Sequence, residues 1–278
     1  MRKGASRRPM RREPALVSAL ARGLAVLRCF ESGNVPLTNA DLARLTRIPK
    51  PTVSRLTATL VAAGLLARDP ARETYALAAG VLPLAQAFLS GLDVRAQSRA
   101  SMAALAEQTG ATVYLGVRSG LEMVIIETCQ PRAPVLLPRL AVGSRIALAT
   151  SALGRAYLAA LPAERRETLE RELAALHGAD WPAVQRALRQ PLAEAATTGV
   201  CLSLGELYAD IHSIATAIVR PDGEPVALVC GGAAYAFAEA RLRSEVRPRL
   251  LAAAAEIARS IGGRTLAQNA LADLAPTV

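Results

Sequence analysis

The chain has 278 residues, of which 52% are hydrophobic and 3% aromatic, and its formal net charge is +10. This length predicts two domains with separate cores, and the composition predicts aliphatic cores rich in helices. The positive excess is local, because residues 1–90 hold 14 Lys and Arg against 5 Asp and Glu while the remainder is nearly balanced. A basic first third favours a polyanionic partner for that part, and a solvated charged face is the alternative.

Several classes of protein are excluded by the same composition. The arginine-rich first 14 residues are followed by no apolar segment, so no secretory signal is expected. The uncharged run Thr74 to Leu92 is interrupted by Gly80 and Pro83, which favours a buried connector over a membrane span. The cysteines lack paired spacing, which predicts free thiols in a reducing cytoplasm and neither a zinc site nor another cofactor. They are Cys29, Cys129, Cys201 and Cys230.

The first elements in chain order are a basic arm and an amphipathic helix. Residues 1–14 carry six Lys and Arg and one acid, a composition typical of a disordered arm. Between Ala15 and Phe30 apolar residues recur at helical spacing, which predicts a first helix that Gly33 and Pro36 end.

Two further helices and a hairpin follow. Thr38 can cap a second helix with Asp41 in its first turn, and a third helix is predicted from Lys50 to about Gly64. Two short strands should then flank a polar turn between Leu65 and Leu77. Three helices followed by such a hairpin predict a winged helix-turn-helix.

The exposed residues of this unit suit duplex DNA. Near the start of the third helix the outward side chains can reach base edges, while arginines on the second helix and the wing can bind phosphate. The alternative is that the same unit serves only for packing or for docking another protein. The candidate DNA-binding residues are Thr38, Arg44, Arg47, Lys50, Thr52, Ser54, Arg55, Arg68 and Arg72.

The rest of the chain alternates helical and strand patterns. A helix is predicted from Val94 to Gln108, a hairpin turns at Ser119-Gly120, and a long helix runs from about Ala238 to Ile261. Two further strands should be joined by the turn at residues 221–224. This order predicts an α+β fold with a mainly antiparallel sheet flanked by helices.

Particular runs resemble the IclR family of transcriptional regulators. They are LTNADLARLT at 37–46, IPKPTVSRL at 48–56, YAL at 75–77, VGS at 142–144, SALGR at 151–155 and GE at 205–206. The resemblance implies a homodimer or dimer of dimers paired partly through the connector, operator DNA as a partner, and a C-terminal domain that binds a small-molecule effector. The expected division is a basic arm (1–14), a winged helix-turn-helix (15–78), a connector helix (79–92), an effector-binding domain (93–265) and a C-terminal tail (266–278).

Carried over by motif, the family's effector pocket falls on Val135, Ile146, Ala152, Leu153, Ser203, Ile211, Ser213, Cys230 and Gly232. Alternation supports this set, because Ile211 and Ser213 share one strand face, as do Cys230 and Gly232. Ala152 also lies at a predicted helix N-terminus, which favours an anion, so we expect an organic acid. Ordinary core packing is the alternative for each of these residues.

Two departures from the family pattern bear on the ligand. Leu204 stands where the family often has an acid, and Ala217 where it often has proline. Two rival functions remain at this point: a metabolic enzyme fused to a helix-turn-helix, and RNA binding through the winged helix. The sequence contains two histidines and no nucleophile elbow, phosphate loop or metal-ligand spacing, so we expect no catalysis.

Overall fold

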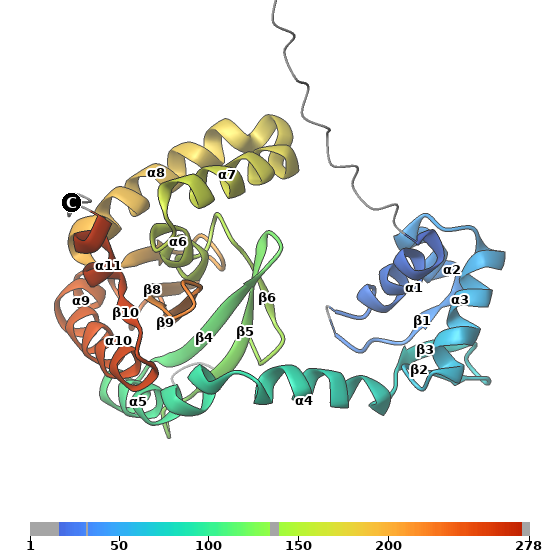
Figure 1. Ribbon diagram of the computed structural model, residues 1–278. Coiled ribbons are helices and arrows are strands. Elements are labelled where there is room, and N and C mark those ends of the chain that lie inside the picture. The colour runs from blue at the N-terminus through green and yellow to red at the C-terminus, as the bar shows by residue number, and fades with distance from the viewer. Residues whose placement is uncertain (1–16, 32, 134–138, 274–278) are drawn as a thin grey trace, which may run out of the picture. The chain divides into compact units, whose positions relative to one another are not determined.

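The computed structural model describes residues 17–31, 33–133 and 139–273. The chain separates into two compact units, residues 1–87 and 88–278, which are taken in turn below (Figure 1). The predicted basic arm and Val135 lie outside the described residues. Within the described part, none of the helices combines the length and apolarity needed to cross a bilayer.

The N-terminal unit is a winged helix-turn-helix, as the sequence predicts. It combines three helices with a small antiparallel sheet of strand order β1-β3-β2. Their bounds are α1 Ser18–Arg28, β1 Leu37–Thr38, α2 Asn39–Thr46, α3 Lys50–Ala62, β2 Leu66–Asp69 and β3 Thr74–Leu77. The strand β1 is additional to the prediction, and it pairs Leu37 with Tyr75.

Local interactions set the boundaries of these elements. The side chain of Thr38 accepts a hydrogen bond from the backbone N–H of Asp41, and the Asp41 carboxylate accepts one from the backbone N–H of Thr38, which forms the predicted capping box. Arg47 ends α2 in the left-handed region at φ 57°, and Pro51 lies in the first turn of α3. The core of this unit comprises Val26, Phe30, Leu42, Ile48, Val53, Leu60 and Leu66.

A short 3-10 turn at Ala79–Val81 leads into helix α4, Leu82–Ser90. The predicted connector of residues 79–92 is therefore helical over most of its length. The expectation that the connector is buried is wrong for the single chain: no residue of α4 is buried, and its large apolar side chains Leu82, Leu84 and Phe88 are exposed.

The C-terminal unit is built on a seven-stranded antiparallel sheet, which confirms the expected fold class. The strand order is β10-β8-β9-β4-β5-β6, and β7 pairs with β8. The strands are β4 Thr112–Ser119, β5 Glu122–Cys129, β6 Arg145–Ala147, β7 Cys201–Leu204, β8 Ile211–Val219, β9 Pro225–Ala233 and β10 Arg264–Thr265.

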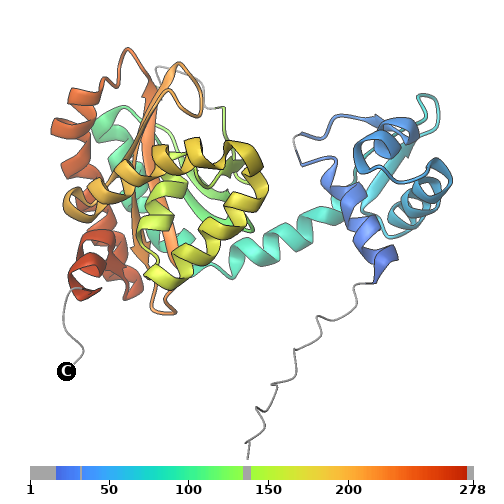
Figure 2. The ribbon, with the colours of Figure 1, turned by 90° about the horizontal axis from the view of Figure 1, so that it is seen from above.

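Helices cover both faces of this sheet (Figures 1 and 2). One cluster of buried side chains packs α6, Ala152–Ala159, α7, Ala163–His177, and α8, Trp181–Thr198, on one face. A second cluster packs α5, Asp93–Thr109, and α10, Arg247–Ile261, on the opposite face. Strand residues therefore alternate between two separate cores.

The C-terminal end of the chain departs from the prediction in two places. The expected long helix from Ala238 is divided into α9, Glu239–Arg241, a π-helical turn at Leu242–Val246, and α10. The segment expected as a tail contains helix α11, Leu266–Asp273, and Leu266 is buried in the core.

Candidate functional site

Helix α3 presents a polar face to solvent. Lys50, Ser54 and Arg55 are exposed and Thr52 is half-buried, whereas Val53 and Leu60 pack inward. Thr57 is fully buried, and its hydroxyl donates to the carbonyl oxygen of Val53 at 3.0 Å. The first two turns of α3 therefore present a cluster of exposed polar side chains.

A hydrogen bond that the sequence analysis did not anticipate joins α2 to this face. The Asn39 side-chain amide donates to the Ser54 hydroxyl oxygen at 2.8 Å. Because this bond occupies an acceptor position of Ser54, its O–H remains available to donate outward. A residue 15 positions away in the chain gives no local signal of such a contact.

The structure gives Thr38 a capping role. Its hydroxyl donates to the Asp41 carboxylate at 2.7 Å and accepts from the Asp41 N–H at 3.1 Å. The helix cap therefore uses both the donor and an acceptor position of the Thr38 hydroxyl. These bonds from Thr38 lower the pKa of Asp41 below its ordinary value. Arg44 also reaches Asp41, at 3.5 Å.

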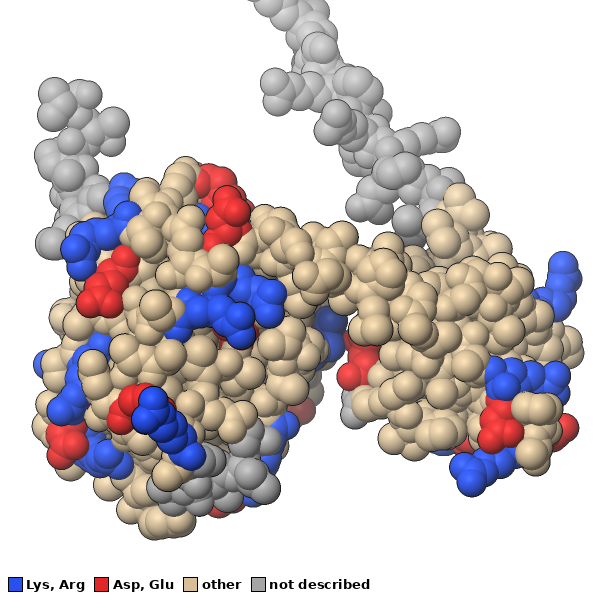
Figure 3. All heavy atoms as spheres, turned by 90° about the horizontal axis from the view of Figure 1, so that it is seen from below, with Lys and Arg blue, Asp and Glu red and all other residues tan. Residues whose placement is uncertain are grey.

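The remaining predicted arginines lie on the surface of the same unit. Arg47 and Arg68 are exposed, and Arg72 lies 3.9 Å from Asp69 across the wing turn. The turn is ordered by Asp69, whose side chain accepts from the backbone N–H of Arg72 at 3.2 Å. The space-filling view shows basic and acidic groups side by side on the visible face of this unit (Figure 3).

A pocket opens on the α6 face of the large sheet. It encloses about 680 Å³ of atom-free space including its open mouth. Seven of the nine predicted effector residues line it, which brings together residues from β6, α6, β7, β8 and β9. These seven are Ile146, Ala152, Leu153, Ser203, Ile211, Ser213 and Gly232.

The prediction for Cys230 is wrong. Its side chain is fully buried in the cluster on the opposite face of the sheet, with α5 and α10. Its neighbours Val229 and Gly231 line the pocket instead. Gly232 lines the pocket through its backbone, because a Cβ there would meet the Phe237 ring at 2.5 Å on the other face.

The N-terminus of α6 forms one wall of the pocket. The Ser151 hydroxyl accepts from the Gly154 N–H at 3.0 Å and caps the helix. The backbone N–H groups of Ala152 and Leu153 precede this bond in the first turn, where an α-helix leaves its N–H groups without intrahelical acceptors. Leu153 approaches Gly116 so closely that a Cβ at residue 116 would lie 2.7 Å from it.

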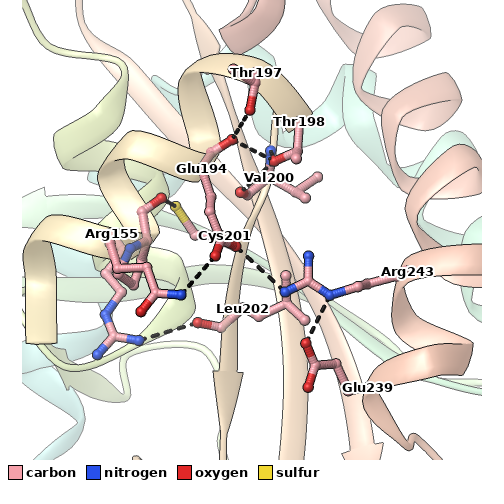
Figure 4. Close-up of polar contacts among 11 residues, drawn as sticks. Arg155, Glu194, Thr197, Thr198, Val200, Cys201, Leu202, Glu239 and Arg243 are labelled. Atoms are coloured by element: carbon pink, nitrogen blue, oxygen red, sulfur yellow. Dashed lines mark hydrogen bonds and ion pairs between the residues drawn. The ribbon is translucent and has the colours of Figure 1, made fainter.

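A polar network fixes strand β7, which carries Ser203 into the pocket (Figure 4). The Cys201 thiol donates to the Pro191 carbonyl at 3.6 Å, and Arg155 donates to the Leu202 carbonyl at 3.2 Å. The Arg155 side chain is only 3% exposed, and it also forms two bonds to the carboxylate of Glu206, at 2.6 and 2.8 Å. The position of Ser203 therefore depends on contacts outside the pocket.

Sequence reasoning missed several polar residues of the lining. Thr112, Tyr114, Arg139 and Tyr208 all face the pocket. Burial raises the pKa of Tyr114 to about 12, so its hydroxyl is a donor at neutral pH. None of these four lies in the motif runs, so no sequence signal singled them out.

The described residues offer little for catalysis by thiol or metal. They contain no group of three His, Cys, Asp or Glu side chains placed to hold a metal ion. Burial raises the pKa of both Cys201 and Cys230 to about 12, so these thiols stay protonated and unreactive. Cys29 and Cys129 are also free, and burial raises their pKa values too.

Comparison with known proteins gives matches over most of the chain. Residues 19–70 match the IclR helix-turn-helix domain, and residues 86–260 match the bacterial transcriptional regulator IclR C-terminal domain. The HTH-type transcriptional regulator TsaQ1/TsaQ2 of Comamonas testosteroni is 33% identical over 84% of this chain and 85% of its own length. The Pca regulon regulatory protein of Pseudomonas putida is 27% identical over 90% of this chain and 86% of its own.

Solved structures show the same fold. An IclR family transcriptional regulator from Brucella abortus is 36% identical, covers 88% of this chain and 93% of its own, and superposes with a TM-score of 0.79. An IclR homologue from Microbacterium hydrocarbonoxydans, solved with 4-hydroxybenzoate, is 22% identical over 88% of this chain and 99% of its own, with a TM-score of 0.68. The chain therefore belongs to the IclR family and is a DNA-binding transcriptional regulator.

Proposed function

We propose that the protein binds a specific operator through α3, and that a small organic acid in the C-terminal pocket modulates this binding. The observation that carries the proposal is the pocket itself: a mostly apolar chamber closed at one wall by the capped N-terminus of α6. An apolar body and a carboxylate are the two properties that such a chamber selects.

The operator part of the proposal rests on the exposed face of α3. A recognition helix enters the major groove with its N-terminal residues at the base edges. Lys50 and Arg55 can donate to guanine or phosphate, and Ser54, held by Asn39, can donate to either. Arg44, Arg47, Arg68 and Arg72 are placed for phosphate contacts, which add affinity without reading sequence.

The acid part rests on the chemistry of the lining. We assign the ligand carboxylate to the first-turn N–H groups of Ala152 and Leu153, where the helix dipole favours negative charge. Ile146 and Ile211 supply apolar contacts, while Ser203 and Ser213 can hydrogen-bond to polar substituents. The 4-hydroxybenzoate complex of the Microbacterium homologue supports an acid of this kind here.

Pairing of subunits belongs to the same proposal. The exposed side chains of Leu82, Leu84 and Phe88 on α4 are 65%, 68% and 54% accessible, and apolar groups exposed together mark an interaction site. A second copy of the chain is the partner we assign, giving a dimer or tetramer. Sedimentation of a Leu84→Ser and Phe88→Ser double variant should then show a smaller species than the wild type.

A ligand screen tests the proposal for the pocket. Carboxylic acids paired with their primary amides should be compared by thermal shift on the full chain. We expect acids to raise the unfolding midpoint more than their amides, because the amides lack the charge that the α6 N-terminus attracts. Stabilisation by only neutral or cationic compounds would contradict the proposal.

Modulation requires a second measurement. An acid that stabilises the protein should change operator affinity in a titration with fluorescent duplex DNA selected from a random pool. A matched titration with structured RNA tests whether the winged helix prefers RNA to duplex DNA. Binding of the acid with no effect on operator affinity would leave a ligand site but remove its regulatory role.

A further inference from the structure

We propose that Arg139 is an anion-binding residue of the pocket, and that a ligand anion can replace its present partner, Asp210. The pocket is then selective for elongated acids that carry a second anionic group. The proposal rests on the proposed acid site at α6 and specifies its ligand further. In the part of the pocket that the structure describes, Arg139 is the only charged side chain of the lining.

In the structure, the Arg139 guanidinium is bound by Asp210. Its two terminal nitrogens donate to the two carboxylate oxygens of Asp210 at 2.8 and 2.6 Å. The guanidinium carbon also lies 5.2 Å from the centre of the Tyr208 ring, and Tyr208 lines the pocket. Arg139 is thus held at the pocket by one carboxylate and one aromatic face.

The bond to Asp210 is one that a ligand can replace. The side chains of Arg139 and Asp210 are 45% and 56% exposed, so water and salt screen the pair even though it is joined by two bonds, and a ligand can reach it from solvent. The planar fork of arginine binds any carboxylate in the same two-bonded geometry. The bonds from Arg139 lower the pKa of Asp210, so Asp210 competes as a full negative charge at neutral pH. A ligand carboxylate that arrives with its own apolar contacts can take its place.

Two groups that attract anions face different ends of the pocket. Leu153, in the first turn of α6, lies against Gly116, whose partner on β9 is Ala227. Asp210, which holds Arg139, directly precedes Ile211, whose partner on β9 is Ala233. The apolar side chain of Val229 lies between these positions along β9 and faces the pocket. A ligand that uses both groups must be elongated, with an acceptor at each end and an apolar middle.

The exchange would also break a link between two loops. Arg139 precedes β6, and Asp210 lies in the loop between β7 and β8. Their ion pair ties these loops together across the pocket. A ligand that binds Arg139 frees Asp210 and thereby changes how the loops are held, which gives the pocket a way to report occupancy.

A series of para-substituted benzene acids separates the two ends. Titration calorimetry on the full chain should compare benzoate, which has one carboxylate, with terephthalate, which has a carboxylate at each end. We expect terephthalate to bind wild-type protein about tenfold more tightly. Arg139→Ala should remove this advantage and leave benzoate affinity nearly unchanged. Asp210→Asn should increase the advantage several-fold, because the competing carboxylate is gone.

Matched variants keep the result interpretable. Arg132→Ala removes another exposed arginine from the preceding part of the chain, one that pairs with Glu107 at 4.0 Å and does not line the pocket. It should behave as wild type. Arg139→Lys keeps the charge without the planar fork and should give an intermediate advantage. Unfolding midpoints measured by circular dichroism verify that each variant folds.

Each remaining outcome has a definite meaning. A terephthalate advantage that persists in Arg139→Ala, or that falls in Asp210→Asn, overturns the role of Arg139. Benzoate binding without any advantage for terephthalate in the wild type overturns it too, and leaves the acid site at α6 standing. Failure of every acid to bind the folded wild type overturns the acid site and this inference together.

Discussion

The helix-turn-helix and the C-terminal pocket are built in opposite ways. On α3 the proposed DNA-binding groups are polar side chains, most of them exposed to solvent, and the core beneath them is small. In the C-terminal unit the proposed effector pocket lies where the sheet carries small residues, such as Ser213 and Gly231, beside close-packed neighbours. Changes on α3 should therefore alter binding with little effect on folding, whereas changes around the pocket should affect both.

The largest expected effect is on the exposed side of this comparison. Replacing Lys50 and Arg55 together by alanine should lower operator affinity by about 100-fold or more, because each good base contact contributes about 1–3 kcal/mol of discrimination. Fluorescence anisotropy with selected duplex DNA measures this. The double variant Arg186→Ala and Arg189→Ala removes the same charge from exposed positions on α8 and is the control. Unchanged affinity and selectivity at Lys50 and Arg55 would remove α3 as the reading helix.

The next effect tests the packed side. Gly154→Ala places a Cβ 2.1 Å from the Leu148 carbonyl oxygen, a backbone atom that cannot move aside cheaply. We expect a loss of about 2–3 kcal/mol in the free energy of unfolding, as for other overpacked sites. Urea denaturation followed by circular dichroism measures it. Ala159→Gly in the same helix removes a partly buried Cβ and should cost about 1 kcal/mol, mainly through backbone entropy.

Filling the pocket should separate ligand binding from stability. Ser213→Leu puts a larger side chain on the pocket face of β8 and should weaken acid binding at least tenfold. Ile214→Val, on the opposite face of the same strand, should cost about 1 kcal/mol of stability and leave acid binding intact. Calorimetric titration of both variants decides the matter. Equal loss of acid binding in the two would mean that the faces are not independent.

The capping box gives a smaller effect within the N-terminal unit. Thr38→Ala should destabilise the helix-turn-helix by about 1 kcal/mol, since it removes the side-chain acceptor of the α2 cap. Thr38→Ser retains the hydroxyl and should recover most of the loss. Thermal unfolding of the full chain compares the two. An alanine variant as stable as the serine variant would show that the cap is dispensable.

The same cap predicts a weak pH dependence. The pKa of Asp41 is lowered in the folded state, chiefly by the hydrogen bond from the Thr38 hydroxyl. The ionised carboxylate therefore stabilises the fold at pH values above 3.8, the ordinary pKa of aspartate. This contribution is lost as the pH falls through the lowered folded-state pKa. Asp41→Asn should therefore show a shallower loss of stability than wild type below about pH 4. An unchanged acid profile would mean that other carboxylates dominate it.

Features controlled by neighbouring residues could be predicted from the sequence. The Thr38–Asp41 cap, the position of Pro51 in the first turn of α3 and the turn after Asp69 depend on contacts within a few residues. Each of these three features meets a local requirement of the backbone, so the sequence pattern is enough to predict the winged helix-turn-helix. Seven residues of the pocket lining were also predicted, because the resemblance to the family carried them over.

Tertiary structure decided the rest. A strand points successive side chains to opposite faces of the sheet, so a prediction that is wrong by one position assigns a core residue to the pocket. This happened on β9, where Cys230 lies in the core while Val229 and Gly231 line the pocket. Arg139 and Asp210 are 71 residues apart and form their ion pair only because two loops meet at the pocket. Strand pairing and loop contacts bring together residues that no local sequence pattern relates, and these long-range contacts determine which residues line the pocket.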